Sequence, residues 1–228
     1  MNFIVTSNQM KTAEQNAVNR GLPLRKLAEN AASVCYSYIV QKTGNPREKT
    51  FAFLCGSGMN GGDGMLLAGM IKEAGGEVLC IFVSGIPVSG IAKEIYQRCS
   101  LLLPTTLYKG NELAVQTALT NCHMIIDCVF GTGFRGNLDS DTAELFKFIN
   151  EDCRTSKTSG VSKMSIDIPS GIDSDTGKRA DFAFIPDTTL ILGAYKKGIL
   201  SHFRQRGKAA FARASCRFRK VLCRKESE

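Results

Sequence analysis

Hydrophobic and polar positions alternate along this chain with two different periods. Short apolar runs, such as Phe51 to Leu54 and Met124 to Cys128, lie between longer stretches in which apolar residues return every three or four positions. Short runs of this kind are typical of buried strands, and the longer stretches are typical of amphipathic helices. Strands that alternate with helices indicate a parallel sheet covered on both faces, so we expect an α/β fold.

Two helices are expected before the first long strand. The first runs from Ser7, its predicted cap, to Arg20, and the second runs from Leu24 until Gly44. Further helices are predicted over residues 63–74, 90–103, 112–120 and 141–150. Strands are predicted over residues 51–55, 78–83, 124–128, 164–168 and 188–192, with a weak strand near Leu107. The polar stretch 154–162 is interpreted as a mobile surface loop.

Length and charge indicate one domain followed by a basic tail. A chain of 228 residues, 43% of them hydrophobic, can bury one sizeable core, and we expect a single domain over residues 1–200. The net charge of +8 is concentrated in residues 201–228, where nine Lys and Arg against two Glu give +7 and leave +1 for the rest. A nearly neutral body lacks the electrostatic footprint of a polyanion-binding protein, so nucleic acid is not an expected partner.

The nine cysteines show no Cys-x-x-Cys pair, and several lie in apolar runs where free cysteine behaves as a small hydrophobe. This usage favours a reducing compartment, and we expect a cytoplasmic protein. No segment approaches the roughly 18 to 20 apolar residues needed to span a bilayer, so no membrane association is expected.

A glycine-rich turn at residues 56–64 joins a predicted strand to a predicted helix. Glycines let the backbone approach a ligand closely, and the N–H groups at a helix start point towards it. The turn therefore predicts an oxygen-binding or phosphate-binding site, although such a turn can also be a tight connection. Asp63 would repel a pyrophosphate lying directly on these amides, whereas Asn60 and Asp63 offer oxygens to a cation or to hydroxyl and amide groups.

The same turn satisfies the dinucleotide-binding fingerprint, because glycines stand at positions 56, 58 and 61. That fingerprint also asks for an acidic residue at the end of the next strand, and this chain has Ser84 and Gly85 there. An NAD-dependent dehydrogenase is therefore disfavoured.

Two aspartates stand near the ends of apolar strands, each before a glycine-containing turn. Asp127 precedes the turn at residues 131–136, and Asp167 precedes Ser170 and Gly171. Either side chain alone would be interpreted as a cap for the loop that follows. Because all strands of a parallel sheet end at one edge, we expect both carboxylates to lie near the glycine turn of residues 56–64. A buried, unpaired carboxylate costs several kcal/mol, so each needs a cation, a hydroxyl or amide N–H groups as partner.

Three segments resemble the signature segments of the NAD(P)H-hydrate epimerases, the YjeF N-terminal domain family. They are Gly-Ser-Gly-Met-Asn-Gly-Gly-Asp-Gly (56–64), Asp-Cys-Val-Phe-Gly-Thr-Gly-Phe-Arg-Gly (127–136) and Asp-Ile-Pro-Ser-Gly (167–171). Residues 27–32 resemble the early helix of the family, and residues 193–198 resemble its late lysine-glycine segment. The match runs in the right order from about residue 8 to about residue 200.

The resemblance implies a Rossmann-like three-layer α/β/α sandwich with a mostly parallel central sheet, usually a homodimer. It implies an isomerase that interconverts the R and S epimers of hydrated NADH and NADPH, called NADHX and NADPHX. A dehydratase on a separate chain would then act on the S form. The potassium ligands implied are Asn60, Asp127 and Ser170. The substrate contacts implied are Met59, Asn60, Gly61, Gly62, Asp63, Gly131, Thr132, Gly133, Phe134, Arg135, Gly136, Asn137 and Asp167.

Epimerisation at a carbon that bears a hydroxyl beside a ring nitrogen requires loss and return of that hydroxyl, or ring opening and closing. Both routes need a group that passes a proton at the oxygen, and the candidates for this catalytic role are Asp127 and Asp167. An Asp127 that binds potassium stays ionised, which favours Asp167.

Two departures keep a second hypothesis open. Met59 stands where the family usually has a second asparagine, and residues 203–213 are basic where the family normally closes with another strand. The alternative is a catalytically silent, dimeric scaffold or binding protein that uses the basic tail. The retention of Asn60, Asp127, Asp167 and Ser170 speaks against it.

Overall fold

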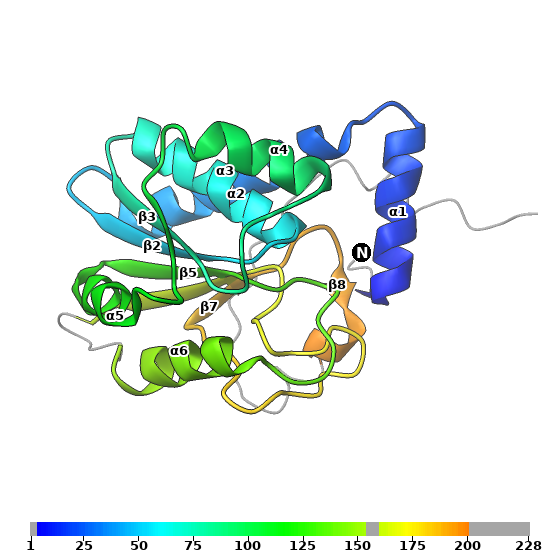
Figure 1. The fold of residues 1–228 in the computed structure, drawn as a ribbon. Coiled ribbons are helices and arrows are strands. Elements are labelled where there is room, and N and C mark those ends of the chain that lie inside the picture. The colour runs from blue at the N-terminus through cyan, green and yellow to red at the C-terminus, as the bar shows by residue number, and fades with distance from the viewer. Residues whose placement is uncertain (1–3, 154–159, 201–228) are drawn as a thin grey trace, which may run out of the picture.

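A six-stranded, entirely parallel sheet forms the centre of the computed structural model, which describes residues 4–153 and 160–200 (Figure 1). The strand order is β4-β3-β2-β5-β6-β7. The strands are β2 (Thr50–Cys55), β3 (Glu77–Phe82), β4 (Thr105–Leu107), β5 (Met124–Cys128), β6 (Ser162–Ile166) and β7 (Thr188–Leu190). All neighbouring pairs are parallel and in continuous register, for example Phe51 beside Val78 on one side and Met124 on the other.

Helices cover both faces of the sheet, as the alternation of strands and helices predicted. Figure 1 shows α2, α3 and α4 on one face and α5 and α6 on the other. Their bounds are α2 (Leu24–Thr43), α3 (Met59–Glu73), α4 (Gly90–Cys99), α5 (Glu112–Asn121) and α6 (Ser140–Glu151). Alternate residues of β2 separate the two cores, since Phe51 and Phe53 join the α2–α4 side while Ala52 and Leu54 join the α5–α6 side. The fold is the expected three-layer α/β/α sandwich.

The chain reverses its direction across the sheet between β2 and β5. From β2 it proceeds outward through β3 and β4, and from β5 it proceeds the other way through β6 and β7. The loops that follow β2 and β5 therefore diverge, which opens the crevice where open α/β sheets bind ligands. At Gly56 the two loops come so close that an added Cβ would lie 2.0 Å from the carbonyl oxygen of Val129.

Two element boundaries differ from the sequence predictions near this crevice. Helix α3 begins at Met59, four residues before the predicted start, so residues 59–64 of the glycine-rich turn belong to the helix. Strand β6 spans Ser162–Ile166 instead of 164–168. Asp167 thus lies just beyond the strand with φ of 67°, a left-handed conformation supported by its N–H bond to the Leu190 carbonyl at 2.7 Å.

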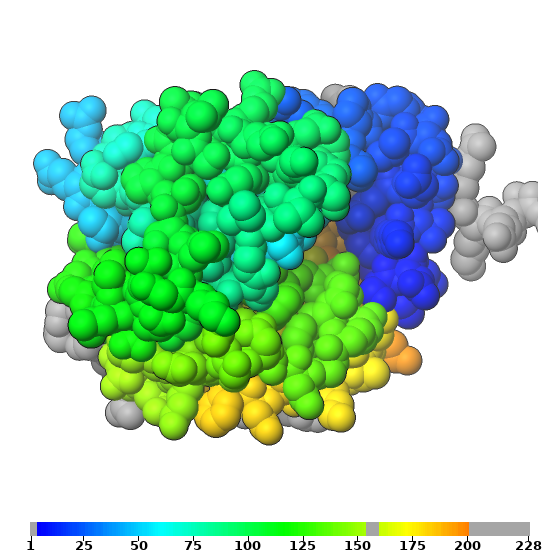
Figure 2. Space-filling view, viewed as in Figure 1, coloured from blue at the N-terminus to red at the C-terminus, as the bar shows by residue number. Residues whose placement is uncertain are grey.

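A second, two-stranded parallel sheet was not predicted. It pairs β1 (Ile4–Val5) with β8 (Tyr195–Lys196), so a short strand precedes the first helix. Helix α1 (Ser7–Asn19) follows, and its cap is Thr6 instead of the predicted Ser7: the Thr6 hydroxyl accepts the Gln9 N–H and the Gln9 side chain accepts the Thr6 N–H. In Figures 1 and 2, α1 lies along one side of the molecule, outside the three layers.

Some predictions concern residues outside the described ranges. The predicted surface loop falls mostly on residues 154–159, and its last residue, Ser162, begins β6 instead. The basic tail, residues 201–228, also lies outside the description. Across residues 4–153 and 160–200, no helix combines the length and the apolar character needed to cross a membrane.

Candidate active site

A cavity of about 700 Å³ opens at the crevice beside the carboxyl ends of β2, β5 and β6. Its volume is within the range of small-molecule and cofactor sites. Helices α1 and α2, the start of α3, the loop after β5 and the segment before β8 supply its walls. The predicted substrate contacts that line it are Met59, Asn60, Asp63, Gly131, Thr132, Gly133, Phe134, Arg135, Asn137 and Asp167. Gly61, Gly62 and Gly136 lie outside the lining, as do Asp127 and Ser170.

Asp127 is fully buried behind the cavity wall. Its carboxylate accepts four hydrogen bonds: from the Ser165 hydroxyl (2.8 Å), the Ser170 N–H (2.8 Å), the Ser170 hydroxyl (2.5 Å) and the Val129 N–H (3.2 Å). Burial raises the pKa of Asp127 to about 6, while the hydrogen bonds from Ser170 and its neighbours oppose that rise. The side chain thereby joins the loops after β5 and β6.

Asn60, Phe130, Ser170 and Asp127 form one continuous chain of polar contacts. The Asn60 amide nitrogen donates to the Phe130 carbonyl at 2.8 Å, and the Phe130 N–H donates to the Ser170 hydroxyl at 2.8 Å, which in turn donates to Asp127. The predicted potassium ligands are therefore brought together around the Phe130 carbonyl. Amide, carbonyl, hydroxyl and carboxylate oxygens are the donors that hard cations accept, so the residues fit an alkali cation. Within the described ranges, no group of three His, Cys, Asp or Glu residues gathers as a metal site.

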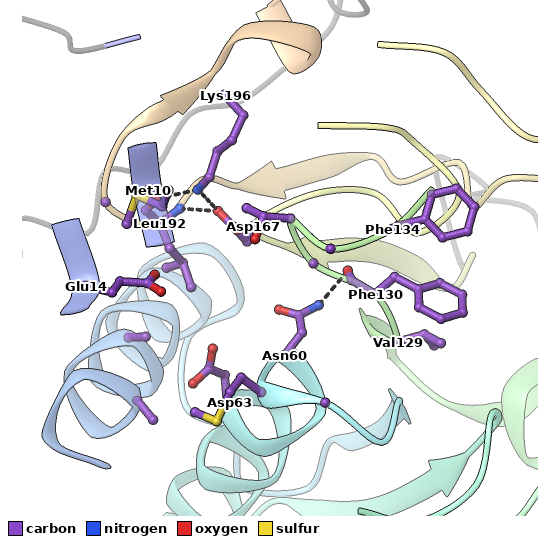
Figure 3. Close-up of a pocket in the computed structure, with 18 of the residues that line it drawn as sticks. Met10, Glu14, Asn60, Asp63, Val129, Phe130, Phe134, Asp167, Leu192 and Lys196 are labelled. Carbon is purple, nitrogen blue, oxygen red and sulfur yellow. Dashed lines mark hydrogen bonds and ion pairs between the residues drawn. The ribbon is translucent and has the colours of Figure 1, made fainter. Parts of the chain in front are cut away.

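Asp167 faces the cavity and is paired with a buried lysine. The Lys196 ammonium, only 1% exposed, forms an ion pair with Asp167 Oδ1 and donates to the Leu192 carbonyl at 2.7 Å. The Leu192 N–H donates to the same carboxylate oxygen at 3.1 Å, as Figure 3 shows. A buried ion pair of this kind is costly to break because the remaining charge has no partner. The pair fixes the direction of the Asp167 carboxylate.

Besides Asp167, the acidic residues Glu14, Asp63 and Asp139 line the same cavity, and Glu14 and Asp63 are the two with raised pKa values. Glu14 extends from α1, and Asp63 lies on the second turn of α3 (Figure 3). The Oδ1 atom of Asp63 is buried with no hydrogen-bond partner in the described part of the chain. Burial is the main cause that raises the pKa of each carboxyl group, and the charge of Asp167 raises both further. Both groups therefore favour the protonated state more than an exposed acid does.

Arg135, predicted as a substrate contact, lines the cavity but has several protein partners. Its guanidinium forms ion pairs with Asp175 (2.7 Å) and Asp173 (3.3 Å) and donates to the Ser7 hydroxyl at 2.8 Å. Asp175 also accepts from the N–H and hydroxyl of Ser7, at 2.6 and 2.5 Å. Arg135 thus helps to attach the start of α1 to the loops around the cavity.

Comparison with known families identifies the chain. The family model described as "YjeF-related protein N-terminus" matches residues 24–198. The chain belongs to this YjeF N-terminal family. The matched segment contains all the residues that were predicted to form the site.

Curated relatives of this YjeF N-terminal chain carry two kinds of name. The NAD(P)H-hydrate epimerases of Elusimicrobium minutum and Nitrosopumilus maritimus are 26% and 27% identical over 86% of this chain and 88% and 87% of their own length. The bifunctional NAD(P)H-hydrate repair enzyme Nnr of Dictyoglomus turgidum is 33% identical over 86% of this chain. The alignment spans 37% of that relative's own length. The solved structure of yeast YNL200c, 19% identical, has a TM-score of 0.73 over 92% of this chain and 87% of its own, and so shows the fold.

Neither a role for Glu14 nor the Lys196–Asp167 pair was predicted from the sequence. Lys196 belongs to the late lysine-glycine segment, but its partner lies 29 positions earlier along the chain. Glu14 lies four positions after the buried Met10 and three before the buried Ala17, so helical spacing places it beside the apolar face of α1, and that spacing was the available signal. The unpredicted pairing of β1 with β8 joins the start of α1 to Lys196 and so brings both residues to the cavity.

Proposed function

We propose that this chain is an isomerase that epimerises hydrated NADH or NADPH, interconverting their R and S forms. The observation that carries the proposal is Asp167, ion-paired to a buried lysine and facing a cavity of about 700 Å³ at the switch point of the sheet. The YjeF N-terminal family membership and the relatives named NAD(P)H-hydrate epimerase support the same activity. The gathered polar groups disfavour a silent scaffold, which has no need of them at this edge.

The chemistry requires proton transfer at the hydroxyl of a carbon beside the ring nitrogen. Asp167 is the carboxylate suited to this role, since it faces the cavity while Asp127 lies behind the wall. The Lys196 ammonium and the Leu192 N–H hold the Asp167 carboxylate in place at the cavity. Asp127 holds Ser170 and the Val129–Phe130 backbone in place. That Asp127 itself passes the proton stays a prediction.

Asn60, Asp127 and Ser170, with the Phe130 carbonyl, would hold a potassium ion. When bound, such an ion supplies positive charge and order to the loops after β2, β5 and β6. Melting temperatures in KCl and in choline chloride test this. We expect stabilisation by potassium in the wild-type chain and its loss in Ser170→Ala. An equal response of the two proteins contradicts the assignment.

The proposal includes an oligomeric state and a cellular compartment. We expect a homodimer, in the cytoplasm, whose S product is consumed by a dehydratase. The cysteines in the described ranges are all free, which supports a reducing compartment. Light scattering of the purified chain tests the dimer, since a monomeric mass at assay concentration contradicts it.

Incubation with the pure R-hydrate tests the activity directly. Chromatography should reveal the S form appearing at a rate far above that of a protein-free control. Asp167→Asn should lower kcat by on the order of 10²- to 10⁴-fold, the usual contribution of a general acid or base. Asp152→Asn, on the exposed end of α6, is the matched control and should keep the wild-type rate. No epimerisation by the folded wild-type chain rejects the function.

A further inference from the structure

We propose that Glu14 and Asp63 together form a second acid–base group, which acts on the opposite face of the substrate ring from Asp167. This inference rests on the proposed function. It adds to the site a residue from α1, which precedes the family match beginning at residue 24. Figure 3 shows the carboxyl groups of Glu14 and Asp63 directed into one side of the cavity, with the Asp167–Lys196 pair across from them.

The arrangement of charges favours a protonated state of this pair. The cavity is lined by Glu14, Asp63, Asp139 and Asp167 against Arg135 and Lys196. Lys196 is committed to Asp167, and Arg135 to Asp173 and Asp175. Two further ionised carboxylates would therefore oppose each other in a poorly solvated space and would repel the phosphates of a dinucleotide.

The burial of Asp63 agrees with a protonated carboxyl. Its Oδ1 atom is buried and unpartnered within the described part of the chain, which is unfavourable for a permanent carboxylate. The charged and titratable groups that influence this pair are Asp167 and Lys196. The Cys35 thiol of α2 also lies near Asp63, and burial raises its pKa so that it stays protonated. A proton on either carboxyl removes the repulsion and leaves a donor facing the cavity.

Inversion of a hydroxyl-bearing carbon explains why two groups are needed. The protonated pair gives its proton to the hydroxyl, the C–O bond breaks with its electrons on the departing water, and the ring nitrogen's lone pair forms a C=N bond. A water then attacks the opposite face, the C=N electrons return to nitrogen, and Asp167 accepts the water's proton. Asp167 then releases its proton to solvent, and solvent returns a proton to the pair. The reverse reaction exchanges the two roles, so each epimer's hydroxyl meets one of the two groups.

Oxygen exchange in ¹⁸O-water separates the two groups. The wild-type chain should incorporate one solvent oxygen per inversion. Glu14→Gln and Asp63→Asn should each lower the epimerisation rate by on the order of 10²-fold or more. Both variants should still exchange a hydroxyl oxygen with solvent, without inversion, in the epimer whose hydroxyl faces Asp167. Asp167→Asn should show the complementary pattern and exchange the hydroxyl oxygen of the other epimer. A merely structural role for Glu14 does not produce this complementarity.

The pH profile is a second readout. Loss of the Glu14 charge lowers the pKa of Asp63, so the alkaline limb of kcat should move to lower pH in Glu14→Gln. Glu144→Gln, on the exposed face of α6, is the matched control and should keep the wild-type profile. Circular dichroism verifies that each variant folds.

The failures of the two proposals are distinguishable. A wild-type chain that neither epimerises nor exchanges oxygen rejects the function itself. If the wild-type chain is active, three results overturn the two-group inference. Glu14→Gln keeps the wild-type rate, or all three variants lose oxygen exchange in the same epimer. The third is an inverted product that retains its original oxygen.

Discussion

The hydroxyl of Ser170 donates to the carboxylate of Asp127 at 2.5 Å, and the Ser170 N–H donates to the other oxygen of the same carboxylate at 2.8 Å. Asp127 on β5 therefore holds the turn after β6 through both the backbone N–H and the side chain of Ser170. This double attachment positions the loop that contains Asp167, three residues before Ser170.

Asp127→Asn should destabilise the fold. An amide replaces one acceptor oxygen by a donor, which then faces the N–H and hydroxyl groups that now bond to the carboxylate. A buried hydrogen-bond group left without a partner costs roughly 1–3 kcal/mol, so we expect a loss of about that size in the free energy of unfolding measured in urea. An unchanged urea midpoint would show that the carboxylate is not needed to hold the turn.

Gly56→Ala should destabilise much more than Gly58→Ala. A Cβ at Gly56 would lie 2.0 Å from the Val129 carbonyl oxygen, and backbone cannot move aside as a flexible side chain can. At Gly58 the added Cβ meets no described atom within 4 Å. We expect a loss on the order of 3 kcal/mol or more at Gly56 and less than about 1 kcal/mol at Gly58, measured by denaturant unfolding. Equal effects at the two glycines would contradict the close approach of these loops.

Asp63→Asn should be more stable than the wild-type chain at alkaline pH while losing activity. The pKa of Asp63 is raised in the folded state, mainly by burial. Its contribution to stability is therefore present below about pH 4, the ordinary pKa of aspartate, and is lost as the pH rises through the folded pKa. The asparagine variant lacks this loss, so its melting temperature minus that of the wild-type chain should grow as the pH rises above about 4. A difference independent of pH would contradict a raised pKa of Asp63 in the folded state.

Asp175→Asn should loosen α1 without unfolding the central sheet. Asp175 accepts two hydrogen bonds from Ser7 and pairs with Arg135, and its negative charge lies at the positive end of the α1 dipole. Hydrogen bonds to charged groups contribute roughly 1.5–3 kcal/mol, so amide exchange in α1 should accelerate by about tenfold or more. Amides of β2 and β5 provide the internal control and should keep their protection. Uniform acceleration across the chain would indicate global destabilisation instead.

The sequence predicted the layered fold because burial of each strand leaves a local pattern. Apolar runs such as Met124 to Cys128 are fully buried in the sheet, and their order along the chain fixes the alternation with helices. Asp127 was correctly expected near a strand end for the same reason. The start of α3 was missed because glycines are weak helix formers, whereas here tertiary packing against Gly56 and Cys128 decides the conformation.

The chemical environment of the site was less accessible from the sequence. Asp167 was expected inside a strand, but its left-handed backbone and its lysine partner depend on Leu190, Leu192 and Lys196, all distant along the chain. The contribution of Glu14 depends on a two-stranded sheet of four residues, too short to leave a periodic pattern. Contacts between such distant positions have no local signal in a single sequence.

The pairing of β1 with β8 also has a consequence for biosynthesis. Ser7 and Asp175 are separated by 168 positions, and Ile4 can form its strand pair only after Tyr195 has been synthesised. During translation the layered body can assemble from its own successive units while the first helix is still unattached. The pocket therefore closes late, after nearly all of the domain has left the ribosome, and a nascent chain acquires its shape well before it acquires its chemistry.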